Sequence, residues 1–448
     1  MKKLLFTLCI ASFNLFANPY PDPTQVPVDP PYRNKTYLLK KLSAIELREK
    51  GVEVIRVDVQ WSSPQETYTI SRIVLENSGT EALEKRSKLK PTLGSYIGEL
   101  RSNKTALPLY YDSVGTGMEL RFLTRGMTFR FPKISEQVDF VLTAENPKTG
   151  RMEEVLRQTI DPHNITPITP ETVEVRELKK ATVSPSIMVN IYSEGYSSSN
   201  ELGSAAFFKD AQRVVDALES NHFPGFDRFE MVAAYKISNT QLGKAKNLGM
   251  PIPIRDSYLG LYYPYWNDIS RWYNIVYPTS EKKFRDGVGV IPYDYAIALV
   301  DSSEYWGMGN YNVFTAIPTR HPSFTYLLTH EFGHFFGLNE EYEGGGKTEL
   351  AFAPEILEPW SQNITFHPKK EELKWIEFVE PSTALPTPAM AWQANGPWGA
   401  YRGGYAQTEP LRKSHKPGLS CIMKNGTKFC PICKAAIEKK ILYDVGLN

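Results

Sequence analysis

The sequence has almost no excess of charge of either sign. Its 448 residues carry 51 lysines and arginines against 50 aspartates and glutamates, which gives a formal net charge of +1. A protein that follows the phosphate backbone of DNA or RNA needs a clear basic excess, so we expect no nucleic-acid partner. Hydrophobic residues make up 42% and charged residues 23%. This composition is that of an ordinary globular protein, and the length suggests about two or three domains.

Long apolar runs are also missing, apart from one at the start of the chain. Lys2 and Lys3 precede an apolar stretch over residues 4–16, which Ala17 closes before a proline-rich segment. This order is typical of a cleavable signal peptide, and the stretch is too short to be a membrane anchor. We therefore expect a signal peptide over residues 1–17, a secreted or periplasmic protein, and no membrane anchor.

Cysteine is scarce as well. One of the four cysteines lies in the apolar stretch, and the others are Cys421, Cys430 and Cys433. Because an exported chain meets an oxidising compartment, we expect a disulfide from Cys421 to one of the other two, with one thiol left over. The C-x-x-C spacing also permits a redox motif or half of a zinc site, but the cysteines that would complete a tetrahedral zinc site are absent.

The first part of the chain after the signal has the pattern of a β-rich domain. Residues 18–34 are rich in proline and predict an extended leader. Over residues 55–61 apolar and polar residues alternate, which predicts a strand with one side facing water. Similar runs occur at residues 68–75, 120–131, 138–143 and 155–160. Several short strands with little helical pattern predict a β-sandwich over residues 35–165.

The pattern changes after this region. Residues 187–196, 229–238 and 295–301 resemble strands, and residues 204–220 place apolar side chains at helical spacing. Alternating strands and helices predict an α/β domain, which we place at residues 180–448. The expected fold class is therefore α+β, with an N-terminal β-sandwich followed by this domain.

The richest chemistry lies in the segment HEFGHFFGLNEEY, which starts at His330. His330 and His334 are one helical turn apart, so both imidazoles can reach one ion. Upstream, Ser323 can cap a helix whose apolar residues follow at helical spacing. H-E-x-x-H on a helix is the zinc site of a class of metallopeptidases, in which Glu331 would be the general base.

A catalytic zinc ion commonly takes three protein ligands and one water. Gly337 permits the left-handed backbone that ends a helix, so the next residues can fold back under the metal. Glu340 then lies where the longer motif H-E-x-x-H-x-x-G-x-x-H places its last histidine. We expect one Zn²⁺ ion bound by His330, His334 and Glu340, with Glu341 as the competing third ligand.

The sequence resembles the IgA-peptidase family of zinc metallopeptidases, a metzincin-like group. The resemblance rests on the HEFGH segment with its Glu-Glu-Tyr ending, on GAYRGGY at residues 399–405, and on CIMKNGTKFCPICKAAI at residues 421–437. It implies an N-terminal β-sandwich and a metzincin-like peptidase domain, with the two histidines and Glu340 as zinc ligands and Glu331 as base. Most relatives have aspartate at the position of Glu340. Met423 matches the methionine of the turn beneath the metal.

Some metzincins place a tyrosine two residues after this methionine to stabilise the oxyanion, but Asn425 occupies that position here. Another donor is needed. The candidates are Tyr342, Tyr401 and Tyr405.

These features together predict a secreted zinc endopeptidase that hydrolyses protein or peptide substrates with water activated by Glu331. An extended substrate would pair with an exposed strand edge, for which residues 310–317 are the candidate, although a fully paired interior strand is an equal alternative for this segment. Two alternatives remain open, namely a catalytically inactive secreted binding protein or adhesin on a peptidase scaffold, and an amidase acting on cell-wall peptides. The sequence gives no indication of an oligomeric state.

Overall fold

The computed structural model of the protein describes most of the chain. The described residues are 26–29, 37–62, 67–115, 125–146, 151–197, 203–239, 243–244, 256–263, 276–343, 358, 361–393, 396–405 and 413–447. The predicted signal peptide and most of the predicted leader lie outside these residues, so export stays a prediction. Within the described ranges, no helix has the length and apolar character needed to cross a bilayer.

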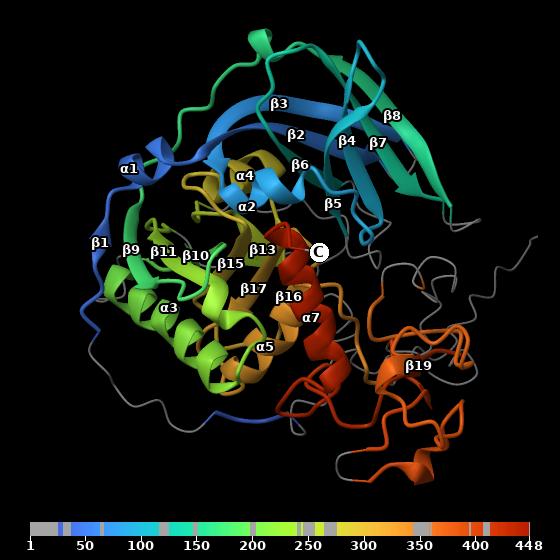
Figure 1. Ribbon diagram of the computed structural model, residues 1–448. Coiled ribbons are helices and arrows are strands. Elements are labelled where there is room, and N and C mark those ends of the chain that lie inside the picture. The colour runs from blue at the N-terminus through green and yellow to red at the C-terminus, as the bar shows by residue number, and fades with distance from the viewer. Residues whose placement is uncertain are drawn as a thin grey trace, which may run out of the picture.

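The predicted β-rich N-terminal region is confirmed, and it consists of two antiparallel sheets (Figure 1). The first sheet has the order β3-β2-β6, with β2 at Val52–Ser62, β3 at Thr67–Gly79 and β6 at Arg125–Pro132. The second has the order β5-β4-β7-β8, with β4 at Tyr96–Ser102, β5 at Pro108–Val114, β7 at Val138–Glu145 and β8 at Met152–Ile160. Apolar side chains of both sheets form one buried cluster, which is the core that the alternating pattern predicted.

The prediction that the polar side of the first of these strands faces water is wrong. In β2, Arg56 and Asp58 are buried, although they alternate with the apolar core residues. The Arg56 guanidinium lies 2.6 Å from a carboxylate oxygen of Glu76 and 2.6 Å from one of Asp286. Asp286 belongs to α4 (Glu281–Val288), more than two hundred residues away in the chain. The alternating pattern correctly showed that the two sides of β2 differ in polarity. It did not show that charged partners cover Arg56 and Asp58 on the polar side.

The rest of the chain is organised around a mixed sheet of seven strands (Figure 1). In spatial order the strands are β1 (Lys41–Leu42), β9 (Glu174–Lys179), β11 (Phe229–Tyr235), β10 (Ile187–Glu194), β15 (Tyr295–Val300), β17 (Phe314–Pro318) and β16 (Met308–Asn310). The three strands predicted for this part of the chain are β10, β11 and β15, and they are parallel neighbours. The mixed α+β class is therefore confirmed. The domain boundaries stay predictions.

Helices and loops cover both faces of this sheet. On one face, α3 (Gly203–Ser220), α5 (Phe324–Phe335) and α7 (Pro431–Asp444) contribute to a large apolar cluster. On the other face, α4 contributes to a second cluster. The short elements are α1 (Ala44–Glu49), α2 (Glu81–Arg86), β12 (Gly243–Lys244), β13 (Leu261–Tyr263), β14 (Tyr277–Pro278), β18 (Tyr401–Arg402) and β19 (His415–Lys416).

The predicted edge strand at residues 310–317 differs from the observed one. The chain turns back within that segment, where Asn312 has a φ of 56°, so the segment contributes to two strands. β17 lies inside the sheet between β15 and β16, and the edge is the short strand β16. The candidate substrate edge therefore shifts a few residues toward the N-terminus.

We predict that Arg56→Met destabilises the fold by about 3–5 kcal/mol, because it removes the buried cation that the carboxylates of Glu76 and Asp58 share. Denaturant unfolding followed by circular dichroism measures this loss. The control is Arg157→Met, which removes an exposed arginine paired with Glu154 and Asp139 and should cost no more than about 1 kcal/mol. Equal losses in the two variants would contradict a stabilising role for the buried ion pairs.

Candidate active site

Helix α5 presents the two motif histidines on one side, next to the apolar face that packs on the sheet. Leu327, Leu328 and Phe332 of this helix belong to the large apolar cluster, which fixes the helix on the sheet. One turn apart, His330 and His334 direct their Nε2 atoms toward each other at a distance of 3.2 Å. The spacing read from the sequence therefore places both imidazoles at one point.

Backbone carbonyls determine which nitrogen of each ring carries the proton. Nδ1 of His330 lies 2.9 Å from the carbonyl oxygen of Ile422, and Nδ1 of His334 lies 2.7 Å from that of Leu338. A carbonyl only accepts, so each Nδ1 must donate, and in a neutral ring Nε2 is left with its lone pair. Burial, together with the neighbouring His334, lowers the pKa of His330 to about 3 and keeps that ring neutral. Two lone pairs that face each other suit a shared cation, so the donor set fits a metal ion such as Zn²⁺.

The N-terminus of α5 is capped by a residue from the predicted leader. The carboxylate oxygens of Asp29 accept hydrogen bonds from the backbone N–H of Thr325, at 3.1 and 3.3 Å, and from its hydroxyl. Ser323 occupies the N-cap position, but its side chain makes no capping bond, so that part of the prediction is wrong. A carboxylate at a helix N-terminus also interacts favourably with the helix dipole, which explains why a distant residue can replace the local cap.

The chain turns back after α5 as the sequence predicted. Gly337 has a φ of 84°, in the left-handed region that glycine adopts most easily. Beyond the turn, an Oε1 atom of Glu340 lies 3.8 Å from Nε2 of His334. Glu341 is fully buried and points elsewhere, with its Oε1 atom 3.1 Å from the sulfur of Cys433. Of the two candidate third ligands, Glu340 is the one on the histidine side.

Met423 packs against the underside of α5. Its sulfur lies so close to Gly333 that a methyl group added at that glycine would be 2.8 Å from it. Gly333 stands between the two histidines in the chain, so Met423 contacts the helix turn that carries them, and its role beneath a metal ion stays a prediction. The carbonyl oxygen of Met423 accepts a 2.7 Å hydrogen bond from the backbone N–H of Glu341. The methionine turn and the segment after α5 are therefore joined directly.

The edge strand of the sheet passes directly over Glu331. A side chain at Gly307 would overlap the carboxylate of Glu331, and one at Gly309 would overlap its backbone carbonyl. These two glycines let β16 and the chain before it approach the helix at the predicted general base. The sequence analysis missed them as site residues, although the G-x-G spacing beside a predicted edge strand was a usable signal.

Two tyrosines flank the first histidine. The Tyr342 ring is stacked on the His330 ring, with centroids 6.2 Å apart and planes inclined by 25°. The centroid of the Tyr326 ring is 5.4 Å from that of His330, and the Tyr326 hydroxyl donates to the carbonyl oxygen of Lys424 at 3.2 Å. Tyr326 was not identified from the sequence, because it looked like one more apolar position of the helix.

The other two tyrosine candidates have different surroundings. The hydroxyl of Tyr401 donates a 2.6 Å hydrogen bond to the carbonyl oxygen of Pro397. The backbone N–H of Tyr405 donates a 2.6 Å hydrogen bond to the carbonyl oxygen of Glu340. The GAYRGGY segment therefore supports the predicted third ligand through the backbone. An oxyanion role for Tyr342, Tyr401 or Tyr405 stays a prediction.

The disulfide predicted from Cys421 is not formed. Its sulfur lies 3.7 Å from that of Cys433, whereas a disulfide bond is about 2.05 Å long. Cys421, Cys430 and Cys433 are all free and buried. The spacing of the cysteines allowed a disulfide, but it did not reveal that Glu341 lies beside the same sulfur atoms.

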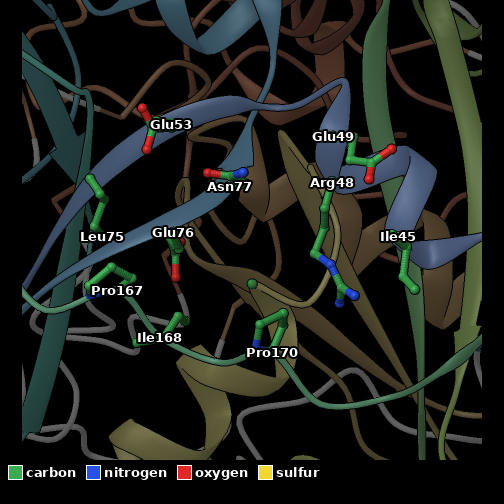
Figure 2. Close-up of a pocket in the computed structure, with 11 residues that line it drawn as sticks. Ile45, Arg48, Glu49, Glu53, Leu75, Glu76, Asn77, Pro167, Ile168 and Pro170 are labelled. Carbon is green, nitrogen blue, oxygen red and sulfur yellow. The ribbon is translucent and has the colours of Figure 1, made fainter.

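A separate pocket of about 430 Å³ opens between α1, the strands β2 and β3, and the segment 167–170 (Figure 2). Arg48 and Glu76 are among its lining residues. None of the predicted site residues lines it, so this pocket belongs to a different part of the surface from the histidine pair.

We predict that Gly309→Ala destabilises the protein by about 1–3 kcal/mol, because the new methyl group meets the backbone of α5 and either the strand or the helix must move. The thermal unfolding midpoint measures this change. Asn310→Ala, in the same strand, is the control and should shift the midpoint much less. A fully stable Gly309→Ala protein would show that β16 does not press on the helix.

The comparison with known proteins agrees with this geometry. No curated protein matches the chain. Residues 175–397 match the family described as IgA Peptidase M64. The matched range is about half of the chain, and it includes α5 with its histidines and Glu340. Through these residues the chain belongs to the IgA Peptidase M64 family, a family of peptidases that act on protein or peptide substrates.

Proposed function

We propose that the protein is a zinc-dependent endopeptidase with a metzincin-like catalytic domain. The observation that carries this proposal is the pair of Nε2 atoms of His330 and His334, 3.2 Å apart and both left as acceptors by the carbonyl contacts of Nδ1. Two acceptor nitrogens that face each other are unfavourable without a cation between the rings. The family match supports peptide hydrolysis as the reaction.

His330, His334 and Glu340 would hold the ion. Zinc, when bound, supplies a Lewis acid that polarises the scissile carbonyl and makes a water proton removable near neutral pH. Glu340 contributes a negative charge where a third histidine would be neutral. Its side-chain contact with His334 and its backbone contact with Tyr405 place it beside the rings.

Glu331 is the group that would move the proton. Its carboxylate is held between α5 and the chain at Gly307, where the lack of a side chain leaves the space that the carboxylate fills. In the proposed reaction, a carboxylate oxygen of Glu331 accepts a proton from the attacking water and then donates it to the leaving amine. The burial of Glu331 excludes bulk water, which would compete for that proton.

The strand β16 is the proposed surface for the substrate backbone. Among the described residues it pairs with β17 on one side and forms the edge of the sheet on the other. An extended peptide can add to such an edge through main-chain hydrogen bonds. The strand passes beside Glu331, because Gly307 and Gly309 let it approach the helix. A peptide bound there would reach the catalytic residues.

We also propose that the protein acts outside the inner membrane, in the periplasm or as a secreted enzyme. The basic start, the apolar stretch and Ala17 support this placement. Extracellular or periplasmic proteins and peptides would then be the substrates.

We predict that Glu331→Gln retains zinc but lowers the cleavage rate by about 10²–10⁴-fold, because the amide cannot accept the proton. His330→Ala should lose both zinc and activity. Elemental analysis measures the metal, and casein digestion together with cleavage of a proteome-derived peptide library measures activity. Glu371→Gln, an exposed carboxylate outside the site, is the matched control and should behave as the wild type.

Three outcomes would contradict the proposal. A fully active Glu331→Gln protein would remove the general base. A wild-type protein that binds zinc but cleaves no peptide would favour the inactive binding protein. Cleavage of cell-wall peptides without digestion of casein would favour the amidase.

A further inference from the structure

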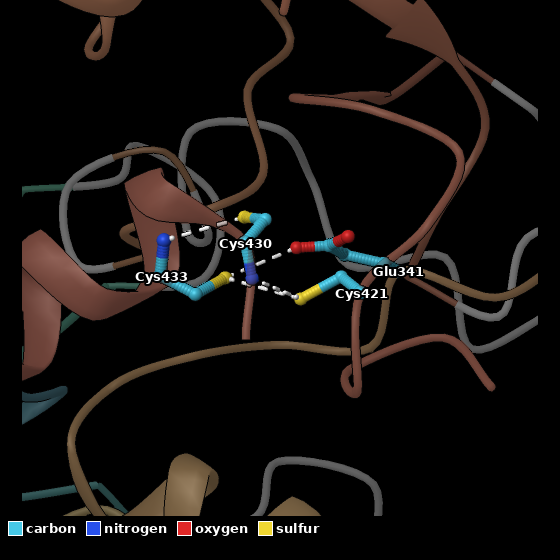
Figure 3. Close-up of side chains that lie close together, drawn as sticks. All are labelled: Glu341, Cys421, Cys430 and Cys433. Carbon is cyan, nitrogen blue, oxygen red and sulfur yellow. Dashed lines mark hydrogen bonds between the residues drawn. The ribbon is translucent and has the colours of Figure 1, made fainter. Parts of the chain in front are cut away.

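A second group of metal-binding side chains lies beside the histidine pair. Glu341, Cys421, Cys430 and Cys433 surround one point in Figure 3, and their ligand atoms all lie within 4.8 Å of one another. They come from three places in the chain. Glu341 belongs to the segment after α5, Cys421 lies in the turn that contains Met423, and the other two cysteines are at the start of α7. The proposed peptidase mechanism uses none of them.

The separation of two of the sulfur atoms is that of two ligands in a tetrahedral metal site. With zinc–sulfur bonds of about 2.3 Å, two sulfur ligands of a tetrahedron lie about 3.8 Å apart. The sulfur atoms of Cys421 and Cys433 are separated by 3.7 Å. The Oε1 atom of Glu341 lies 3.1 Å from the sulfur of Cys433, close enough to share an ion with it. The sulfur–sulfur separation is too long for a disulfide, and all four ligand atoms lie close enough together to converge on one ion.

Burial favours a cation at this point. Glu341, Cys421 and Cys433 have no exposed surface, and Cys430 is 3% exposed. Within the described part of the chain, the Oε2 atom of Glu341 has no hydrogen-bond partner. A buried carboxylate without a cation or a full set of donors is costly. A divalent ion among the sulfur atoms would supply the missing partner.

The nearest lysine does not fill this role. The ammonium group of Lys416 donates to the backbone carbonyl oxygen of Glu341 at 2.5 Å and to the carboxylate of Glu343 at 2.6 Å. It therefore supports the segment without bonding to the Glu341 carboxylate. Its charge also offsets part of the negative charge that three thiolates and a carboxylate would bring.

The surrounding donors are arranged as they are around metal-bound thiolates. The backbone N–H of Cys430 donates to the sulfur of Cys421 at 3.4 Å, and that of Cys433 donates to the sulfur of Cys430 at 3.4 Å. Asn363 donates to Oε1 of Glu341 at 2.9 Å and is itself fixed by the backbone of Asn339. Such outer contacts orient ligands and stabilise their negative charge. The N-terminus of α7 adds a favourable dipole beside Cys430.

We propose that Glu341, Cys421, Cys430 and Cys433 bind one structural Zn²⁺ ion, distinct from the ion of the proposed catalytic site. Four protein ligands leave no position for water, which is the mark of a structural rather than a catalytic zinc site. The ion joins the segment after α5 to the methionine turn and to the start of α7. It therefore holds in place the loops on which the histidine site depends. This site does not require the protein to be a peptidase.

Zinc content of the full chain, measured by native mass spectrometry and elemental analysis, tests this proposal. We expect two zinc ions per chain in the wild type, one in the double variant His330→Ala/His334→Ala, and one in Cys430→Ser. Glu343→Gln is the matched control, because it changes a carboxylate two residues from Glu341 that contacts Lys416 and no thiol. It should retain both ions.

Cobalt substitution identifies which site each variant has kept. Co²⁺ bound by thiolates gives an intense charge-transfer absorption in the near ultraviolet, which nitrogen and oxygen ligands do not give. We expect this absorption in the wild type and in the double histidine variant, and its loss in Cys430→Ser. Glu341→Gln, a nearly isosteric change, should weaken zinc binding at the same site and serves if Cys430→Ser fails to fold.

The possible results separate the two metal sites. A wild-type chain with a single zinc ion that disappears in the double histidine variant, and no thiolate absorption with cobalt, would overturn the second site. A mass two hydrogens lower than that of the reduced chain, with no zinc at the thiols, would show a disulfide instead and would also overturn it. If the double histidine variant and the wild type hold one ion each and Cys430→Ser holds none, the second site is supported and the proposed catalytic site fails.

Discussion

The structure depends on two imidazoles, one buried and one partly buried, whose acceptor nitrogens face each other. His330 and His334 can only take this arrangement because carbonyl groups from two different loops hold their Nδ1 atoms. One carbonyl, that of Leu338, follows the turn at Gly337, and the other, that of Ile422, precedes Met423. The helix supplies the spacing, and the loops supply the orientation. A cation bound to both Nε2 atoms would replace the repulsion between their lone pairs with attraction to the ion, which would explain the arrangement.

The sequence predicted the parts of the site that depend on local geometry. The spacing of the two histidines follows from one turn of helix, and the bend at Gly337 follows from the conformational freedom of glycine. The parallel strands β10, β11 and β15 could also be predicted, because an apolar run is a local feature of the sequence. Family resemblance added Met423, whose place under the helix no local pattern could indicate. For the histidines, the glycine and the strands, a few neighbouring residues carry the information.

Three of the predictions that were wrong concern contacts between separate parts of the chain. Arg56 was placed in water because α4 lies more than two hundred residues away in sequence. Ser323 was given a capping role that Asp29, nearly three hundred residues earlier, takes in the structure. The cysteines suggested a disulfide because their spacing does not show that Glu341 lies beside them. Periodicity describes one element, whereas burial of charge depends on the partner that covers it.

Glu340 and Glu341 connect the histidine site to the group of thiols, because these adjacent residues contact one group each. Glu340 faces His334, and Glu341 faces the thiols, so the short segment after α5 is held from both sides. The hydrogen bond from Glu341 to the carbonyl oxygen of Met423 adds a third restraint. Ordering a loop costs conformational entropy, and a loop that is already restrained costs less to order when a ligand binds. An ion at the thiols would therefore favour metal binding at the histidines without touching them.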